Sequence, residues 1–214
     1  MESKRNIVAG LFGNALEWYD FLLYASFAPL FAKLFFPTDN KFVSLLSTFG
    51  VFAVSFFVRP FGGIFFGHYG DKVGRRKSLI LAITLMTITS LLIGITPAYA
   101  HIGVAATILF TCLRLLQGFI IGGELPSSAT FVIESSLSEH RGFSSSLILS
   151  SAMLGILTGS LVATLVTNLV AKGEMVWSWR LAYLFGALMG VIGIYLRVKS
   201  KESPHFKVEP QFGV

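Results

Sequence analysis

Six long apolar runs, separated by short polar segments, follow one another along the 214-residue chain. Each run holds roughly 20 or more mainly apolar residues, the length that a helix needs to cross hydrocarbon about 30 Å thick. The pattern predicts membrane-spanning helices over 7–36, 43–69, 78–99, 102–133, 143–171 and 179–198. The predicted fold class is therefore an all-α membrane protein. Residues 1–198 would form a six-helix transmembrane bundle, and 199–214 a cytoplasmic tail or the start of an inter-domain linker.

The composition agrees with burial in lipid. Hydrophobic residues make up 54% of the chain and charged residues only 13%, whereas a soluble domain carries about 25% charged residues. The lipid bilayer is accordingly the first predicted partner.

Basic residues are divided unequally between the two predicted membrane surfaces. Six spans place both termini on one side, where eleven basic residues lie: Lys4, Arg5, Lys72, Arg75, Arg76, Lys77, Arg141, Arg197, Lys199, Lys201 and Lys207. The other side has three, which are Lys33, Lys41 and Lys172. Because cytoplasmic loops are enriched in Lys and Arg, this asymmetry predicts that both termini are cytoplasmic. The net charge of +6 then reflects topology, and we expect no nucleic-acid partner.

Five ionisable residues fall inside the predicted spans: Glu17, Asp20, Arg59, Arg114 and Glu124. Each such group costs roughly 2.5–3.5 kcal/mol near the bilayer centre, so pairing or a watery surrounding must offset most of the penalty. The pattern indicates a polar cavity between helices, through which a substrate or a proton would travel.

The two acids of the first span share one helical face. At about 100° per residue, Gly13, Glu17, Asp20 and Tyr24 lie on the same arc. Two carboxylates this close in low dielectric repel each other, and protonation of one would relieve the repulsion, as a proton-coupled carrier requires. The alternative is that both acids pair with arginines and serve helix packing alone.

In the fourth span, Arg114, Gln117 and Glu124 also share an arc. Arg114 and Glu124 are separated by roughly 15 Å of helical rise, so each needs another partner. Arg114 would meet Asp20 or Glu17 across a cavity, or a substrate carboxylate, to which a guanidinium donates two parallel hydrogen bonds. A permanent structural ion pair is the alternative.

Arg59 precedes Pro60 in the second span, where a proline ring tends to kink a helix. The Arg59 side chain would either face the cavity or extend toward the membrane interface. Small residues four positions apart indicate close helix packing, at Gly63 and Gly67 and again at Gly155 and Gly159.

Several kinds of chemistry find no support in the sequence. Cys112 is the only cysteine, which excludes a disulfide framework. No phosphate-binding loop, nucleophile elbow or metal-binding pair of histidines is present. We expect that the protein is not an enzyme and has neither a cofactor nor a metal site. We expect its work to be driven by ion gradients.

Several sequence motifs resemble those of the major facilitator superfamily. The segment GHYGDKVGRRK (67–77) is similar to the signature loop between its second and third helices. GNALEWYDF (13–21), RLLQGFIIGGE (114–124) and WRLAYLFG (179–186) resemble its metabolite:proton symporters, which include proline/betaine carriers. Members usually have twelve spans in two halves, and this chain resembles the N-terminal half.

The resemblance implies a cytoplasmic gate around the signature segment, made of Gly67, Gly70, Asp71, Gly74, Arg75, Arg76 and Glu134. Asp71 would meet a helix end in the second half, assisted by Arg75 and Glu134. We expect Gly70 and Gly74 to let the backbone turn. Arg114 with Gln117 resembles the superfamily's fourth-helix motif, which is associated with proton transfer.

The predicted function is proton-coupled symport of a small zwitterion or carboxylate, such as proline or glycine betaine, across a bacterial inner membrane. A dicarboxylate such as 2-oxoglutarate is an alternative substrate. The sequence is also compatible with a fragment that does not transport and with one half of a split transporter. Further partners would be the solute, protons and either a separately encoded second half or another copy of the chain.

Overall fold

The computed structural model describes residues 2–136, 138–171 and 177–202, and within these ranges the regular structure is entirely helical. The six long helices are α1 (Glu2–Phe35), α2 (Lys41–Val73), α3 (Arg75–Ile95), α5 (Val104–Glu134), α6 (Arg141–Ala171) and α7 (Trp179–Lys199). Two short elements, α4 (Tyr99–Ile102) and the 3₁₀ helix η1 (Ser138–His140), lie in the connections. The predicted all-α class is confirmed.

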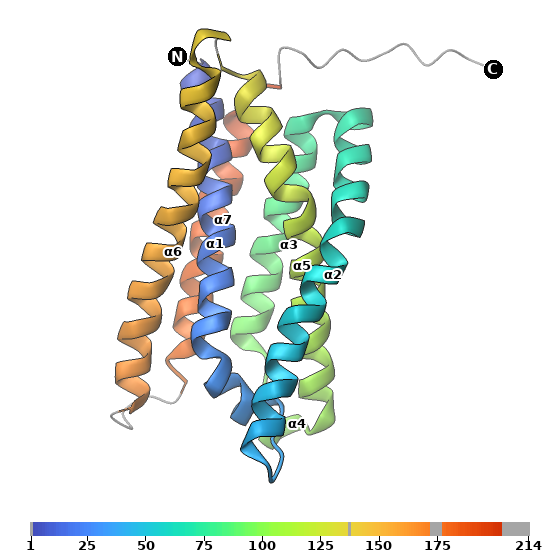
Figure 1. Cartoon of the computed structure of the whole chain (residues 1–214), viewed down its shortest axis with the longest axis vertical. Coiled ribbons are helices and arrows are strands. Elements are labelled where there is room, and N and C mark those ends of the chain that lie inside the picture. The colour runs from blue at the N-terminus through green and yellow to red at the C-terminus, as the bar shows by residue number, and fades with distance from the viewer. Residues whose placement is uncertain (1, 137, 172–176, 203–214) are drawn as a thin grey trace, which may run out of the picture.

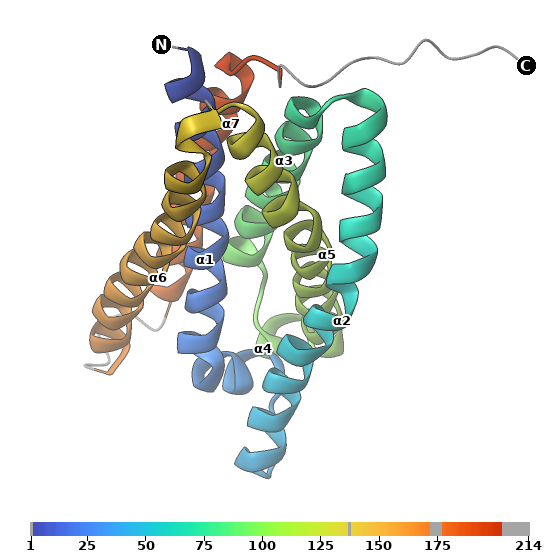
Figure 2. The same ribbon diagram turned by 45° about the horizontal axis from the view of Figure 1, so that its top comes forward.

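The long helices lie side by side in one elongated bundle (Figure 1). α5 packs on α2 and α3, while α1 packs on α6 and α7. Figures 1 and 2 place α6 and α2 on opposite flanks of the bundle. The start of α1 and the end of α7 lie at the same end, where the Asn6 amide donates to the Lys201 carbonyl over 3.1 Å.

The helix boundaries agree with the predicted spans to within a few residues at most ends. Two differences matter. The third span ends at Ile95 instead of residue 99, because α4 forms a separate turn. The second helix continues to Val73, through most of the segment that was expected to be a loop.

Gly74 is the single residue that separates α2 from α3. Its φ of 112° lies in a region that side-chain-bearing residues rarely adopt, so the expected turn at this glycine is confirmed. Gly70 is helical instead, and the expectation that it too turns the backbone is wrong. Asp71, Lys72 and Val73 all tolerate a helix, and one glycine suffices to end it.

Five of the described helices are long and apolar enough to cross a membrane: α2, α3, α5, α6 and α7. The first helix is not among them, although its 34 residues exceed the required length. It carries Glu17 and Asp20 at mid-helix. Both acids are buried, so these charges face protein instead of lipid.

Glycines let α2 and α5 approach to backbone contact. A Cβ atom at Gly62 would overlap the Phe119 carbonyl oxygen, and one at Gly122 would overlap the carbonyl oxygen of Arg59. The predicted partner Gly63 also contributes, since a Cβ there would lie 3.2 Å from the Gly122 oxygen. We name this contact the α2–α5 glycine seam, formed by Gly62, Gly63, Gly118 and Gly122.

Two other small-residue predictions have opposite outcomes. A Cβ at Gly155 on α6 would overlap the Ala15 carbonyl of α1, so close packing at Gly155 is confirmed. At Gly67 a Cβ would meet nothing within 4 Å, and the predicted packing role is wrong. Gly67 lies on a side of α2 that no other described helix covers.

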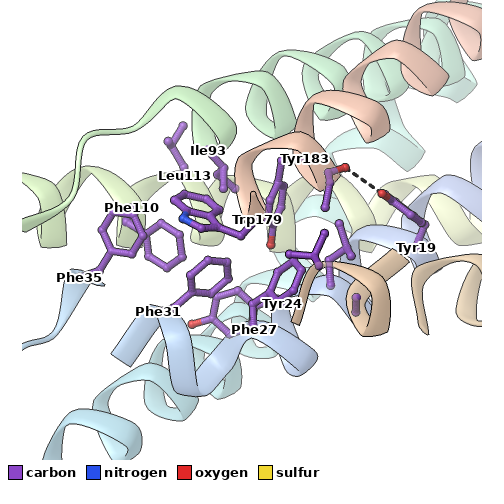
Figure 3. Close-up of a cluster of buried hydrophobic side chains, with 14 of the residues drawn as sticks. Tyr19, Tyr24, Phe27, Phe31, Phe35, Ile93, Phe110, Leu113, Trp179 and Tyr183 are labelled. Carbon is purple, nitrogen blue, oxygen red and sulfur yellow. Dashed lines mark hydrogen bonds between the residues drawn. The ribbon is translucent and has the colours of Figure 1, made fainter. Parts of the chain in front are cut away.

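An aromatic cluster joins three helices at the end of the bundle away from the α2–α3 turn (Figure 3). Phe35 at the end of α1 stacks on Phe110 of α5, with ring centroids 4.1 Å apart. Phe31 contacts Trp179 of α7 edge to face at 5.3 Å. Aromatic pairs add about 0.5–1.5 kcal/mol each beyond area burial, so this cluster closes one end of the bundle firmly.

The glycine seam predicts a specific loss of stability. Gly122→Ala would force α2 and α5 apart, and overpacking of this kind costs about 1–3 kcal/mol. We expect a lower midpoint of thermal unfolding for the purified protein in detergent, followed by circular dichroism. Gly67→Ala is the matched control, and its midpoint should stay equal or rise, because alanine favours a helix by about 1 kcal/mol over glycine. Equal midpoints for the two variants would contradict the seam.

Candidate functional site

The charges predicted to lie within the membrane face the interior of the bundle. Glu17 and Asp20 of α1 are buried, as are Arg114 and Glu124 of α5, and Arg59 of α2 is half-buried. The predicted shared faces of α1 and α5 are therefore the faces that meet other helices. The charges form two groups along the bundle axis. We name them the Asp20 group, which includes Arg114, and the Glu124 group, which lies beside Glu17.

The Asp20 group is built around an acid that is 0% exposed. The Oδ2 atom of Asp20 accepts hydrogen bonds from the Ser90 hydroxyl of α3 and from the Gln117 amide, the latter over 3.2 Å. The Gln117 carbonyl oxygen in turn accepts from the Arg114 guanidinium. Arg114 and Asp20 are thus connected through one amide and form no direct ion pair.

Two further contacts fix the Arg114 guanidinium. It lies over the ring of Tyr24, 3.8 Å from the ring centroid, and a cation over an aromatic face is stabilised by about 0.5–2 kcal/mol. The Tyr24 hydroxyl donates to the Thr48 carbonyl of α2 over 2.7 Å, which holds the ring. Tyr24, predicted only as a member of the acidic face, therefore positions the arginine.

A small cleft between α1, α2 and α5 is lined by Arg114 and Gln117 of the Asp20 group. Its lining combines aromatic side chains with two guanidinium groups and one amide: Phe21, Phe52, Ser55, Phe56, Arg59, Arg114, Gln117, Gly118 and Ile121. Arg59 lies 4.1 Å above the Phe56 ring. Because Arg59 lines the cleft, the structure favours the prediction that its side chain faces a cavity over the alternative that it extends to the membrane interface. Helix α2 continues through Pro60.

The Glu124 group is an ion pair that sequence reasoning missed. Both carboxylate oxygens of Glu124 accept hydrogen bonds from Arg197 of α7. Arg197 lies in the last turn of α7 and is 1% exposed, so its side chain faces the interior of the bundle. The expectation that Glu124 needs a partner other than Arg114 is confirmed. The guanidinium also donates to the backbone carbonyls of Leu79 on α3, over 2.6 Å, and Ala9 on α1, over 3.4 Å.

Gly13 of α1 leaves the space that this ion pair occupies. A Cβ atom at Gly13 would overlap the Arg197 guanidinium and crowd the carboxylate of Glu124. One turn further along α1, the Oε2 atom of Glu17 is buried and has no hydrogen-bond partner among the described residues. The acidic face of α1 therefore serves both groups.

The signature segment forms contacts at the end of the bundle where α1 begins and α7 ends (Figure 1). Asp71 pairs with Arg75 at 2.9 Å and leaves 64% of its own side chain exposed. Arg76, interpreted from the sequence as a topology signal, donates from its side chain to the carbonyls of Arg197 and Val198 at the end of α7. Glu202 accepts in return from the Arg76 backbone amide over 3.0 Å. Helices α3 and α7 thus cap each other.

Glu134, the remaining acid of the predicted gate, ends α5 and is half-buried. The described residues contain no group of three histidine, cysteine or acidic side chains that would hold a metal ion.

Long apolar helices, buried charges that connect through an amide, and a cleft lined by two arginines agree with the resemblance to the major facilitator superfamily. The chain matches the family described as "Sugar (and other) transporter" over residues 6–212 and belongs to that family.

Curated relatives agree with this assignment. The chain is 38% identical over 205 residues to the proline/betaine transporter of Salmonella typhimurium, covering 95% of this chain and 41% of the relative. It is 37% identical over 205 residues to the glycine betaine/proline/ectoine/pipecolic acid transporter of Dickeya dadantii, with the same coverage. The chain therefore spans about two fifths of the length of these relatives.

Solved structures share the fold. The xylose transporter XylE of E. coli in a partially occluded inward-open conformation superposes with a TM-score of 0.80 at 19% identity, covering 96% of this chain and 50% of XylE. The inward-open form of XylE gives a TM-score of 0.75 at 19% identity, covering 94% of this chain and 48% of XylE. The described bundle corresponds to one half of that transporter, and the predicted resemblance to an N-terminal half is confirmed.

The Glu124–Arg197 ion pair predicts a large effect of charge removal. Arg197→Met leaves the Glu124 carboxylate buried without its partner, and removal of one member of a buried pair costs about 3–5 kcal/mol. We expect a strongly lowered midpoint of thermal unfolding in detergent. The double variant Arg197→Met/Glu124→Gln should recover much of the loss. Lys199→Met, at an exposed position of the same helix, is the control, and an Arg197→Met midpoint close to that of the control would contradict the role of the pair.

Proposed function

We propose that this chain is the N-terminal half of a proton-coupled symporter for a small zwitterion, such as proline or glycine betaine. The observation that carries the proposal is the connection of Arg114, through Gln117, to the buried acid Asp20. A cation that would bind a substrate carboxylate is thereby linked by one amide to a group that would take up a proton. The names of the relatives supply the substrate class.

Binding and protonation would be linked through this amide. A substrate carboxylate in the cleft would accept hydrogen bonds from Arg114, whose planar guanidinium donates two in parallel. The Gln117 carbonyl would then lose its donor, and the amide would rearrange at Asp20. Protonation of Asp20 removes a negative charge from a fully buried site, which makes reorientation of the loaded carrier less costly.

The charge balance favours accumulation. A zwitterion carries no net charge, so its entry with one proton moves one positive charge inward. That movement gains roughly 2.3 kcal/mol per 100 mV, which corresponds to about fifty-fold accumulation. This direction assumes both termini in the cytoplasm of a bacterial inner membrane, which the asymmetry of basic residues supports.

The exposed Asp71–Arg75 pair supports a role in gating. In this proposal the Asp71 carboxylate, 64% exposed, meets the N-terminus of a helix in a second half, where the helix dipole favours a negative charge. Glu134 belongs to the same proposed gate. That second half would be encoded with this chain, encoded separately or supplied by another copy.

A dicarboxylate is the second candidate substrate, and one observation favours it. Arg59 and Arg114 line the same cleft, so two guanidinium groups are available for two carboxylates. Glycine betaine would instead place its quaternary ammonium group against the Phe21, Phe52 and Phe56 rings of the cleft. The dicarboxylate would therefore need Arg59, whereas glycine betaine would need the aromatic rings.

Uptake tests the coupling role of Asp20. Cells that lack their own transporters would express this chain alone, or together with the second half of the Salmonella relative, and receive labelled proline, glycine betaine or 2-oxoglutarate. We expect accumulation that a protonophore abolishes, and its loss in Asp20→Asn with normal membrane insertion. Asp39→Asn, at an exposed loop position, is the matched control. Undiminished accumulation by Asp20→Asn would overturn this role, and no accumulation of any of the three by inserted protein would overturn the proposed substrates.

The guanidinium of Arg114 has a separate test. Arg114→Lys keeps the charge but removes the planar set of donors, so we expect the KM of uptake to rise at least tenfold, equivalent to about 1.4 kcal/mol. The exposed Arg141→Lys should leave KM unchanged. An unchanged KM in Arg114→Lys would show that substrate binds elsewhere.

A further inference from the structure

Glu17 is a buried acid that the proposed substrate site does not use. Its side chain is 5% exposed, and its Oε2 atom has no hydrogen-bond partner within the described part of the chain. A buried carboxyl oxygen that is left unpaired costs several kcal/mol when charged and about 1–3 kcal/mol when neutral. Such an atom points to a binding partner, and a small ligand able to donate a hydrogen bond would satisfy it.

A small cavity is lined by Glu17. Its volume is about 10 Å³, close to the space that one water molecule requires. The lining consists of two acidic side chains, a glycine and apolar side chains of α1, α3 and α5: Gly13, Leu16, Glu17, Ile83, Met86, Ile120, Ile121 and Glu124. Glu17 and Glu124 are therefore the side chains in this lining that carry polar atoms. A water in the cavity would have two acidic partners, the smallest number that buried waters usually have.

The charges around the cavity favour one proton for the two acids. Both oxygens of Glu124 accept hydrogen bonds from the Arg197 guanidinium, and the two side chains form an ion pair. A second negative charge at Glu17 would be repelled by Glu124 across the cavity and by Asp20 one turn away on α1. Arg59 on α2 and Arg197 on α7 are the cations that act on Glu17, but no described side chain pairs with it within salt-bridge distance. Glu17 and Glu124 line the same cavity, and two acids that interact strongly titrate as a unit.

We propose that Glu17 and Glu124 form a proton-binding site, in which a single water bridges the two carboxyl groups and Glu17 carries the proton. The neutral Glu17 donates its hydrogen bond to the water, and the water donates to the Glu124 carboxylate. This site differs from the Asp20 site in its helices, since it joins α1 and α5 to α7 through Arg197. Its existence as a proton site is independent of transport, whereas its role in coupling rests on the proposed function.

Proton transfer through this site balances without any further reactant. The O–H bond of Glu17 breaks as its proton passes to the water, and an O–H bond of the water breaks as its proton passes to Glu124. The water is regenerated, Glu17 becomes the carboxylate and Glu124 becomes neutral. Arg197 then loses its charged partner, so the proton position and the α5–α7 contact are linked. Gly13 keeps the space for this exchange, because a Cβ there would overlap Arg197.

Infrared difference spectroscopy tests the site directly. The purified full chain in lipid nanodiscs would be titrated with acid and base, and the carbonyl stretching band of a protonated carboxyl group recorded in H₂O and D₂O. We expect a band that shifts in D₂O, disappears in Glu17→Gln, and changes frequency in Glu124→Gln because the acceptor at the far side of the water is altered. Asp20→Asn should leave this band in place, and the exposed Glu139→Gln is the matched control.

Two results would overturn the proposal: a band that survives in Glu17→Gln, or a Glu17 band that Glu124→Gln does not change. If Glu124→Gln fails to fold because Arg197 is left unpaired, Glu124→Gln/Arg197→Gln removes both charges and gives the same reading. The assay needs no transport. Uptake by protein that shows no Glu17 band would overturn the proton site and leave the proposed function standing. A Glu17 band in protein that shows no uptake would overturn the proposed function and leave the proton site standing.

Discussion

Charge neutralisation inside a medium that cannot solvate ions is the constraint on which this bundle depends. The Glu124–Arg197 pair shows it most clearly, because both members are buried and the guanidinium reaches helices α1, α3 and α5 from α7. Each contact satisfies a donor of the guanidinium, which lipid would leave without a partner. The pair therefore specifies which helices meet, in addition to any stability that it adds.

The same constraint explains the arrangement of the Asp20 group. Asp20 and Arg114 would gain most Coulomb energy from direct contact, yet Gln117 lies between them. An inserted amide weakens the attraction and leaves the guanidinium open to a competing carboxylate. The Glu124–Arg197 pair, with two direct hydrogen bonds, has no such opening. The Asp20 group is thus suited to exchange of partners, and the Glu124 group to holding helices together while Glu124 is charged.

The sequence predicted what depends on local spacing. Hydrophobic run lengths predicted the six long helices, and the 100° rotation per residue placed Glu17 and Asp20 on one inner face. Prediction from the sequence failed where the interaction partner of a residue lies far along the chain. Arg197 follows an apolar run as a surface arginine would, and nothing nearby shows that α5 supplies an acid 73 positions away. Gly67 looks like Gly63 in sequence, and only the position of α5 separates their roles.

The glycine seam has a mechanical consequence. Helices that touch through their backbones have no flexible side chains between them to absorb a displacement, so we expect α2 and α5 to move together. One end of α2 carries Asp71, and Arg59 lies twelve residues, or about 18 Å, further along it beside the cleft. A displacement imposed at the Asp71 end would therefore reach Arg59 and Arg114 together, without a relay of side-chain rearrangements.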